Sequence, residues 1–472
     1  MTAEITANPA KTTGDADAPT GPSPGGSIKQ RAKRGALILI VSQFVGQFFR
    51  LASNLVLTRL LMPEAFGLMA IVNIYIAGIN MFSDLGIKPS IVQNKMGDDP
   101  RFLNTAWTIQ VIRGVGVWAV ACLLAYPLAY GLYDKPILMQ LLPVAALSSI
   151  FLGFQSTKLH TAARHLQLGR EMALLLGSQL TGLVLMGVLA YIYRSVWALV
   201  LGTLTISVLT SVLSHVVFPG PKNRFCWDRA ALGELINFGK WIFFGTVVMF
   251  LATNIDRLLL STLITVEMLG VYQIAFMITS MPNTLIKRFG NKVVFPAVSR
   301  RADIDRGVLN QKLLQNQKRL ALVMVLPVMT LVCAGDWIVR LGWEGDFEQA
   351  GWMASILGFG LWMAMLRATV GPALLAIGKP QYQLYANIGS LLWSGLAATG
   401  GFYLYGMVGF LVAFALCELP AYLIVSVGIA REKLSLWRQD LTLTALLMLA
   451  IAAVLGCRYA LGWGLPFVPA SG

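Results

Sequence analysis

The amino-acid sequence predicts an all-α polytopic membrane protein in which two parallel-related six-helix lobes are followed by about one extra C-terminal helix. Three observations predict this fold class: a strongly apolar composition, a succession of apolar runs about 20 residues long, and an internal repeat. Hydrophobic residues make up 56% of the 472 residues, charged residues make up 12%, and the mean hydropathy is +0.68. Such a composition lies far outside the range of soluble globular domains.

Apolar runs, separated by glycine, proline and charged clusters, predict about thirteen membrane spans. The run from Ala36 to Leu61 is too long for a signal-peptide core and has no small-residue cleavage site, so it is expected to remain as the first span. Residues 1–28 lack periodicity and are expected to form a disordered cytoplasmic tail. The spans are centred near Phe48, Ile76, Ala119, Ser148, Leu180, Ser207, Val248, Ala275, Met329, Trp362, Leu392, Phe414 and Ala450.

Lysine and arginine fall mainly in every second loop between the predicted spans. With the N-terminus in the cytoplasm, the outside turns hold only Arg59, Lys135, Arg194, Arg340 and Arg458. Because cytoplasmic loops collect Lys and Arg, this asymmetry supports both the number of spans and the orientation. It also explains the net charge of +15 through topology, with attraction to membrane lipids as a secondary effect and no nucleic-acid partner.

An internal repeat relates the two halves of the chain. Residues 57–68 match residues 260–271 after a shift of 203 positions, which places Gly67 on Gly270. Both stretches are predicted outside turns that join the first two helices of a six-helix block, so the halves are parallel repeats. The predicted organisation is a disordered tail at 1–28, an N-terminal lobe at 29–218, a cytoplasmic linker at 219–235, a C-terminal lobe at 236–430, and an extra helix with a tail at 431–472.

Polar residues form one stripe on each of the first and seventh predicted helices, at about 100° per residue. Under the shift of 203, Arg50 corresponds to Thr253 and Asn54 to Arg257, so both stripes are expected to face away from lipid. Asp256 and Arg257 are adjacent and point about 100° apart, which makes them poor partners for each other. The stripes consist of Gln43, Gln47, Arg50, Asn54 and Thr58 on the first helix, and of Thr246, Thr253, Asn254, Asp256, Arg257 and Ser261 on the seventh.

The ionisable residues within the spans include more cations than acids. Charges at membrane depth are costly, so they usually face a bundle interior or an aqueous cavity. A surplus of arginine in a cavity between two lobes suits an anionic ligand, because the guanidinium fork matches phosphate oxygens. The residues within spans are Arg50, Arg113, Lys240, Asp256, Arg257, Arg367 and Glu418, and those near cytoplasmic ends are Asp84, Lys158, Lys287 and Arg288.

Structural roles compete with ligand binding at these positions. In the structural alternative, Arg50 donates hydrogen bonds to backbone carbonyls. Asp256 and Arg257 then form contacts that hold neighbouring helices together. Arg113 is near a cytoplasmic helix end, where its side chain can snorkel to the interface. Glu418 is either a proton- or cation-coupling group or a structural carboxylate whose hydrogen bonds are satisfied.

Motifs of the common catalytic and nucleotide-binding sites are absent from the sequence. There is no GxxxxGK[ST], G-x-S-x-G or HExxH, and no paired Cys/His constellation. The five cysteines are scattered, mostly within apolar runs, and are interpreted as small core residues without a disulfide framework. The sequence therefore predicts no enzyme activity, no cofactor and no metal site.

Several stretches together resemble the bacterial polysaccharide-transporter family, the Wzx-like flippases of the multidrug/oligosaccharidyl-lipid/polysaccharide exporter superfamily. The similarity runs from about Arg34 to Ala430. It rests on LTRLLMPEAFGLMAI (57–71), MFSDLGIKPSIVQNK (81–95), FQSTKLHTAARHLQLGREMALL (154–175), VWALV (196–200), ATNIDRLLLSTLITVEMLGVYQIAF (252–276), VVFPAVSR (293–300) and LLAIGKPQY (374–382).

The resemblance implies a V-shaped pair of six-helix lobes in the bacterial inner membrane. It implies that an undecaprenyl-diphosphate-linked oligosaccharide moves from the cytoplasmic to the periplasmic leaflet by alternating access, for exopolysaccharide, capsule or O-antigen biosynthesis. A polysaccharide polymerase and export machinery are the implied partners. Thirteen predicted spans, where the family has twelve or fourteen, depart from its pattern and leave the side of the C-terminus open.

The residues and the resemblance lead to one hypothesis for the site. Arg50 and Arg257 are expected to engage the diphosphate, in agreement with the cationic cavities of the family, and Arg367 is a further substrate-binding candidate. The sugar hydroxyls are assigned to Gln43, Gln47, Asn54, Thr253 and Asn254, and coupling or positioning roles to Asp256, Glu418 and Asp84.

Two other functions fit a membrane protein of this kind less well. A multidrug-type or other small-molecule exporter of the same superfamily would want acidic residues for cationic drugs, whereas the surplus here is basic. A membrane-embedded polysaccharide polymerase or ligase typically needs a sizeable periplasmic loop, whereas the predicted outside turns are short and the longest predicted loop, about 287–319, is cytoplasmic.

Overall fold

The computed structural model describes residues 28–165, 167–290, 294, 298, 306–343 and 345–467, so the predicted tail lies almost entirely outside the described residues. The side chains of Lys240 and Arg288 also lie outside them. The first helices are α1 (Ile28–Leu60), α2 (Pro63–Phe82), α3 (Ile87–Gln93), α4 (Pro100–Tyr126), the π-helix η1 (Pro127–Leu132), α5 (Leu138–Gly153), α6 (Lys158–Arg164), α7 (Leu168–Tyr193) and α8 (Trp197–Val217). They are followed by α9 (Arg229–Leu263), α10 (Val266–Phe289), α12 (Arg306–Gly342), the 3-10 helix η3 (Gly345–Phe347), α13 (Ala350–Ala376), α14 (Gln381–Ala415), α15 (Glu418–Arg431) and α16 (Trp437–Ala460).

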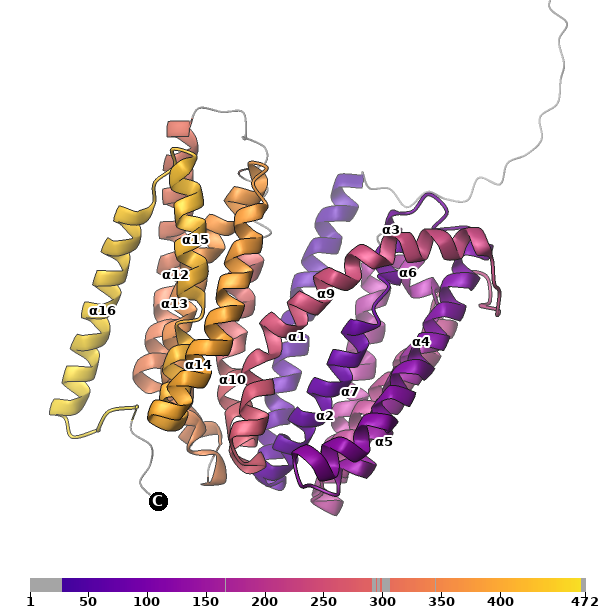
Figure 1. Cartoon of the computed structure of the whole chain (residues 1–472), viewed down its shortest axis with the longest axis horizontal. Coiled ribbons are helices and arrows are strands. Elements are labelled where there is room, and N and C mark those ends of the chain that lie inside the picture. The colour runs from indigo at the N-terminus through magenta and orange to yellow at the C-terminus, as the bar shows by residue number, and fades with distance from the viewer. Residues whose placement is uncertain are drawn as a thin grey trace, which may run out of the picture.

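The helices form two groups that meet at one end. Helices α1 to α8 make up the N-terminal lobe, and α10 with α12 to α16 make up the C-terminal lobe (Figure 1). The ribbons of the two lobes converge at the lower end of the view and stand apart at the upper end. The architecture is therefore the two-lobed, all-helical one that the apolar runs and the repeat predict.

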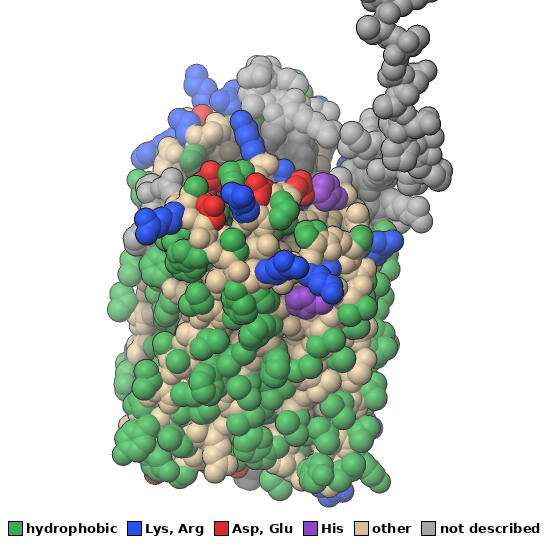
Figure 2. Space-filling model, turned by 90° about the vertical axis from the view of Figure 1, so that its right-hand side faces the viewer, with side chains coloured by type: hydrophobic (Ala, Val, Ile, Leu, Met, Phe, Trp, Pro, Cys, Tyr) green, Lys and Arg blue, Asp and Glu red, His purple; other side chains and the backbone are tan. Residues whose placement is uncertain are grey.

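Basic side chains mark the upper end of the molecule. Figure 2 shows Lys and Arg gathered there, above a wide hydrophobic surface that covers the side of the bundle. The same end contains the first residues of α1, α9 and α12 (Figure 1). We call this the basic end and the opposite one the outer end.

All thirteen predicted span centres lie in helices. Among the described residues, nine segments meet the length and apolarity of a membrane span, or ten when the bent pair of α5 and α6 is counted as one span. Of the three remaining centres, one lies in α1 and one in α10, whose described residues are not among these spans. The third lies in a segment that reverses direction and contains two centres. That segment, Gln381–Arg431, is 51 residues long and is counted as a single span.

The reversal lies in α14 at Tyr405 and Gly406, where the backbone leaves the helical region and Gly406 has a φ of 61°. Trp393 Nε1 donates a hydrogen bond to the carbonyl of Ala413 at 2.8 Å across this break. Residues on the two sides of the break therefore run antiparallel, so the segment accounts for two predicted spans. A positive φ suits glycine, which has no Cβ to clash.

Helix α9 contacts both lobes. Thr246 Oγ1 donates to the carbonyl of Met81 in α2 at 3.0 Å, and Phe250 packs edge-on against Phe82 at 5.3 Å between ring centroids. Further along α9, Asp256 accepts a hydrogen bond from Tyr272 of α10. The first part of α9 thus packs on the N-terminal lobe, and the lobe boundary at residue 236 stays a prediction.

The extra C-terminal helix α16 is attached to the C-terminal lobe by polar contacts near both ends. Asp440 accepts hydrogen bonds from Gln317 of α12 and from Tyr422 of α15, the second at 2.5 Å. At the other end, Arg458 is 5% exposed and forms an ion pair with Asp336. The sequence predicts Arg458 in an outside turn, but it lies in the last turn of α16, where the acid partner makes its burial possible.

Candidate functional site

The two repeats touch each other at the first turns of α2 and α10. A Cβ atom on Gly67 would lie 1.8 Å from the carbonyl oxygen of Val266, and a Cβ on Gly270 would lie 1.9 Å from that of Pro63. Pro63 and Val266 are themselves related by the shift of 203, so the contact is reciprocal. Only glycine permits this approach of the two backbones.

A set of polar contacts, which we call the outer latch, joins the lobes beside the two glycines. Lys135 Nζ lies 2.6 Å from Glu64 Oε1 and 3.7 Å from Glu267 Oε1, and these two glutamates are equivalent in the repeat. The hydroxyl groups of Tyr133 and Ser261 lie 2.9 Å apart and complete the latch. The hydrogen bond with Glu64 raises the pKa of Lys135, so the lysine is charged at neutral pH.

A cavity of about 320 Å³ lies between the lobes. Its described wall comes from α1, α2, α7 and α8 of the N-terminal lobe and from α10 of the C-terminal lobe. Phe66, next to the Gly67 contact, forms part of this wall. The polar residues of the wall are Gln47, Arg50, Ser53, Asn54, Asn73, Thr203, Gln273 and Ser280, and the apolar ones are Leu57, Phe66, Met69, Ala70, Leu183, Met186, Leu199, Ile274, Met277 and Met281.

Arg50 is the one charged residue in the described wall of this cavity. Its side chain is exposed, and it makes no ion pair or hydrogen bond with the described part of the chain. One turn further along α1, the Oδ1 atom of Asn54 is buried without a hydrogen-bond partner among the described residues. The wall therefore presents a cation and an unused acceptor among neutral amides and hydroxyls, which suits an anionic, hydroxyl-rich ligand.

The polar residues of α9 lie outside this wall. The Arg257 guanidinium stacks on the ring of Phe276 at 4.0 Å, and its Nη1 donates to Asn254 Oδ1 at 3.3 Å. Asp256 is 1% exposed and accepts from the Tyr272 hydroxyl at 2.6 Å. Because Tyr272 and Phe276 both belong to α10, adjacent α9 residues bind the same helix through different partners, and they form no ion pair with each other.

The remaining predicted substrate residues are also outside the described wall. Thr253 Oγ1 donates to the carbonyl of Met249 at 2.7 Å, and Asn254 Nδ2 donates to that of Phe250 at 3.1 Å, so both are occupied within α9. Gln43 lies one turn before Gln47 on α1. The structure thus brings Gln47, Arg50 and Asn54 together around one cavity.

Arg367 and Glu418 are partners in the interior of the C-terminal lobe. Arg367 Nη1 lies 2.5 Å from Glu418 Oε2, and its Nη2 donates to Asn387 Oδ1 at 2.5 Å. The side chains are 15% and 22% exposed. This geometry matches the structural alternative for Glu418, in which the carboxylate is satisfied by a neighbour.

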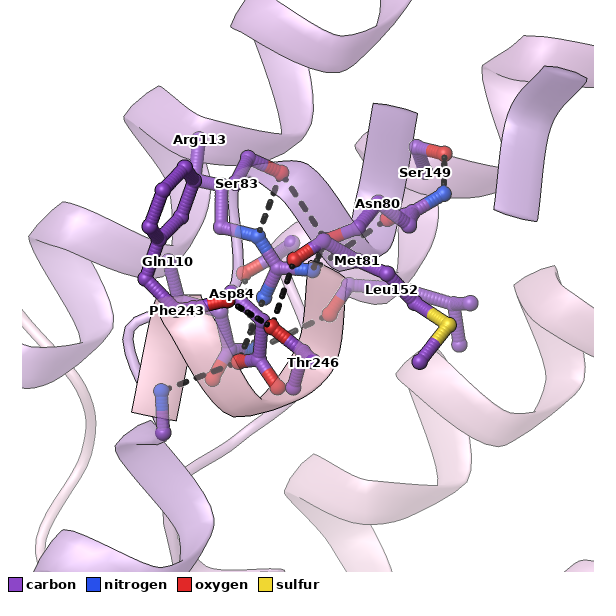
Figure 3. A network of polar contacts seen from close by, with 12 residues as sticks. Asn80, Met81, Ser83, Asp84, Gln110, Arg113, Ser149, Leu152, Phe243 and Thr246 are labelled. Atoms are coloured by element: carbon purple, nitrogen blue, oxygen red, sulfur yellow. Dashed lines mark hydrogen bonds and ion pairs between the residues drawn. The ribbon is translucent and has the colours of Figure 1, made fainter. Parts of the chain in front are cut away.

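Asp84 and Arg113 belong to a polar network at the end of α2 (Figure 3). Arg113 Nε donates to Ser83 Oγ at 3.1 Å, and its Nη2 donates to the carbonyl of Asn80 at 3.1 Å. The Asp84 carboxylate accepts from the Gly86 amide at 2.9 Å and lies 3.8 Å from Arg113. A cation at a helix C-terminus is favourable, so Arg113 fixes the end of α2 rather than extending to the interface.

Five polar residues of the cavity wall were not predicted from the sequence: Ser53, Asn73, Thr203, Gln273 and Ser280. They are polar residues among mostly apolar neighbours, and they form no continuous polar stripe like that of α1. The repeat offers one weak signal, since Gln273 is equivalent to Ala70 and both line the cavity.

Sequence comparison finds a family and distant relatives. A family model described as polysaccharide biosynthesis protein matches residues 56–343. The teichuronic acid biosynthesis protein TuaB of Bacillus subtilis (strain 168) is 21% identical over 315 residues, which cover 66% of this chain and 65% of that protein. The lipopolysaccharide biosynthesis protein WzxC of Escherichia coli (strain K12) is 22% identical over 282 residues, or 59% of this chain and 56% of that protein. The similarity thus spans less than two thirds of these relatives.

Solved structures share the fold. The lipid II flippase MurJ in an inward closed conformation aligns with a TM-score of 0.69 and 14% identity, over 88% of this chain and 92% of that chain. An inward-facing multidrug resistance transporter of the MATE family of the MOP superfamily aligns with a TM-score of 0.62 and 12% identity, over 87% and 99%. At these identities the likeness concerns the fold alone, and it confirms the two-lobed fold class.

Proposed function

Because the chain belongs to the polysaccharide biosynthesis protein family, we propose that it is a flippase for a lipid-linked oligosaccharide. Its substrate would be an undecaprenyl-diphosphate-linked repeat unit, moved from the cytoplasmic to the periplasmic leaflet. The product would feed exopolysaccharide, capsule or O-antigen biosynthesis. The protein would lie in the bacterial inner membrane with its N-terminus in the cytoplasm, and a polysaccharide polymerase and export machinery would use its product.

The observation that carries this proposal is Arg50 in the cavity between the lobes, where it has no ion-pair partner among the described residues. A diphosphate carries negative charge and several acceptor oxygens, which a guanidinium binds through charge-assisted hydrogen bonds. The surrounding amides and hydroxyls, including Gln47, Asn73 and Gln273, suit sugar hydroxyl groups. The apolar side chains of Met69 and Met277 in the same wall suit the apolar faces of a lipid-linked sugar.

The contacts at the outer end support alternating access. The glycine contact and the outer latch join the lobes there, and the ribbons stand apart at the basic end (Figure 1). This is the state in which a substrate from the cytoplasmic leaflet would be loaded. Release on the other side requires that Lys135 loses one glutamate, that Tyr133 separates from Ser261, and that the glycines part.

Arg257 takes a second role in this scheme. In the described state its guanidinium covers Phe276, and its Nε atom is buried without a hydrogen-bond partner among the described residues. A rearrangement of α9 during the transport cycle would free it for the diphosphate. Arg367 remains tied to Glu418 and is assigned a supporting role within the C-terminal lobe.

A small-molecule exporter of the same superfamily is the second candidate, because MATE transporters share the fold. Exporters of cationic drugs need an acid in the cavity, and no Asp or Glu is among the described residues of this wall. The charge of the cavity thus favours an anionic substrate.

A genetic test separates the two candidates. Deleting the gene should abolish surface polysaccharide and cause the lipid-linked repeat unit to accumulate in the cytoplasmic leaflet. Arg50→Gln should fail to restore the polysaccharide, whereas Arg59→Gln, at the outer end of the same helix, should restore it at equal protein levels. Full restoration by Arg50→Gln would contradict the assigned site, and an intact polysaccharide with lost drug resistance in the deletion strain would favour the exporter.

A further inference from the structure

A second, separate cavity lies at the basic end of α12. Its volume is about 190 Å³, and it shares no described lining residue with the central cavity. Two basic residues, Lys312 and Arg319, line this cavity together with Gln315 and Asn316, which carry amide side chains. Among the described lining residues there is no acid. The charge of this cavity suits an anion.

The polar lining follows from the helical spacing. Residues 312, 315, 316 and 319 are separated by three, four and seven positions, which places them on one face of α12. The rise of a helix puts the first and last of them about 10 Å apart along its axis, within reach of one headgroup for two long side chains. Val298, Leu309 and Leu313 supply an apolar wall beside this face. The cavity is thus amphipathic.

Lys312 and Arg319 differ from Arg306 and Lys379 in having no partner among the described residues. Arg306 and Lys379 at the same end both lie near Glu432, at 3.5 Å and 3.3 Å. By contrast, Lys312 and Arg319 form no ion pair or hydrogen bond with the described residues. Their charges are therefore available to a ligand.

The depth of the cavity matches the membrane interface. From Leu320 to Gly335 the chain contains no charged residue, so Arg319 stands at the boundary of the apolar part of α12. Lys312 lies about two turns further out. Basic pockets between transmembrane helices on the cytoplasmic side suit anionic lipid headgroups.

We propose that this cavity binds the headgroup of an anionic phospholipid of the inner leaflet. Lys312 and Arg319 hold the phosphate, and the amides of Gln315 and Asn316 form hydrogen bonds with headgroup hydroxyls. The wall of Leu309 and Leu313, which lies further from the membrane than Arg319, contacts the carbon atoms of the headgroup. The proposal rests on the cytoplasmic orientation of the basic end, and it is independent of the identity of the transported substrate.

The test measures lipid binding by the purified full-length chain. Native mass spectrometry in detergent should show phosphatidylglycerol retained in preference to phosphatidylcholine. In the double variant Lys312→Gln/Arg319→Gln the affinity for phosphatidylglycerol should fall about 25-fold, since each basic residue near an anionic headgroup contributes about five-fold. Lys318→Gln is the matched control, because Lys318 is exposed on the same helix and outside the cavity lining, and it should bind within about two-fold of the wild type.

Two further measurements separate loss of binding from loss of folding, and a phospholipid ligand from free phosphate. The exchange Lys312→Arg/Arg319→Lys retains both charges and should retain phosphatidylglycerol, which matters if the double glutamine variant fails to fold. Phosphatidylglycerol, but not millimolar inorganic phosphate, should raise the thermal unfolding temperature of the wild type. Wild-type affinity in the folded double glutamine variant, loss of binding in the exchange variant, or an equal effect of inorganic phosphate would overturn the proposal.

Discussion

Gly67 of α2 and Gly270 of α10 occupy equivalent positions of the two repeats, and each packs against the first residue of the other's helix. Residue Gly67 meets Val266 while Gly270 meets Pro63, so the contact has the reciprocity of a two-fold axis. The internal repeat, visible in the sequence as a shift of 203 positions, therefore closes the outer end of the molecule.

A methyl group at this contact should force the lobes apart. In Gly67→Ala the new Cβ would lie 1.8 Å from a backbone oxygen, so the helices must shift. We expect a loss of about 1–3 kcal/mol in the free energy of unfolding. The measurement is thermal unfolding in detergent. Gly116→Ala in α4 is the control, since its Cβ meets nothing within 4 Å and alanine favours helix; equal stability of the two variants would contradict the contact.

Removing the bridging charge should loosen the outer end. Lys135→Met leaves Glu64 and Glu267 without their shared cation, and partly exposed ion pairs contribute about 0.2–1 kcal/mol. An engineered cysteine at Ser53 in the cavity, in a background without the native cysteines, should therefore react up to about five-fold faster with an impermeant reagent from outside. Arg340→Gln, another exposed basic residue at the outer end, should leave the rate unchanged, and an unchanged rate in Lys135→Met would exclude a latch role.

The latch should be insensitive to pH across the physiological range. The folded-state pKa of Lys135 is raised, mainly by its hydrogen bond with Glu64, so its stabilisation is present below the ordinary lysine pKa and is lost as pH rises through the folded value. The reaction rate of the Ser53 cysteine, divided by its rate in the unfolded chain at the same pH to remove the titration of the thiol itself, should thus stay flat from about pH 6 to 9 and rise above about pH 10.4. In Lys135→His the rise should move to near pH 6.5, the ordinary pKa of histidine. A rise near pH 7 in the wild type would contradict the charge state assigned to Lys135.

The pairing of Arg367 with Glu418 predicts non-additive effects. Glu418→Gln leaves Arg367 with a weakened partner in the lobe interior and should lower stability, by up to about 3 kcal/mol. The apolar double variant Arg367→Met/Glu418→Leu should recover most of that loss and retain transport. Thermal unfolding and polysaccharide complementation measure the two effects. A stable but inactive double variant would instead assign a coupling role to Glu418.

The sequence alone predicts the helices and the repeat, because both depend on local apolar periodicity. All thirteen predicted centres lie in helices, and the predicted equivalence of Gly67 and Gly270 marks a real contact. Contacts between side chains that are far apart in the sequence were not predictable. Arg367 and Glu418 are 51 positions apart, and nothing in either local sequence indicates the other.

The two repeats differ in what they contribute to the cavity. Asn54 and Arg257 are equivalent by the shift, yet Asn54 lines the cavity and Arg257 stacks on Phe276. The neighbouring helices differ at this point: Phe276 holds the Arg257 guanidinium, whereas the equivalent Asn73 lines the cavity together with Asn54. A stripe of polar residues predicts which face avoids lipid, but the neighbouring helix decides which of its members face the cavity.

The most direct test of the proposed function is flipping of an undecaprenyl-diphosphate-linked oligosaccharide by the purified chain in proteoliposomes. Wild type should transport it, Arg59→Gln should match wild type, and Arg50→Gln should lower the initial rate about ten- to a hundred-fold at subsaturating substrate, the effect of removing a charge-assisted hydrogen bond. Equal rates for Arg50→Gln and wild type, or no transport by the wild type beyond empty liposomes, would contradict an anion-binding flippase cavity.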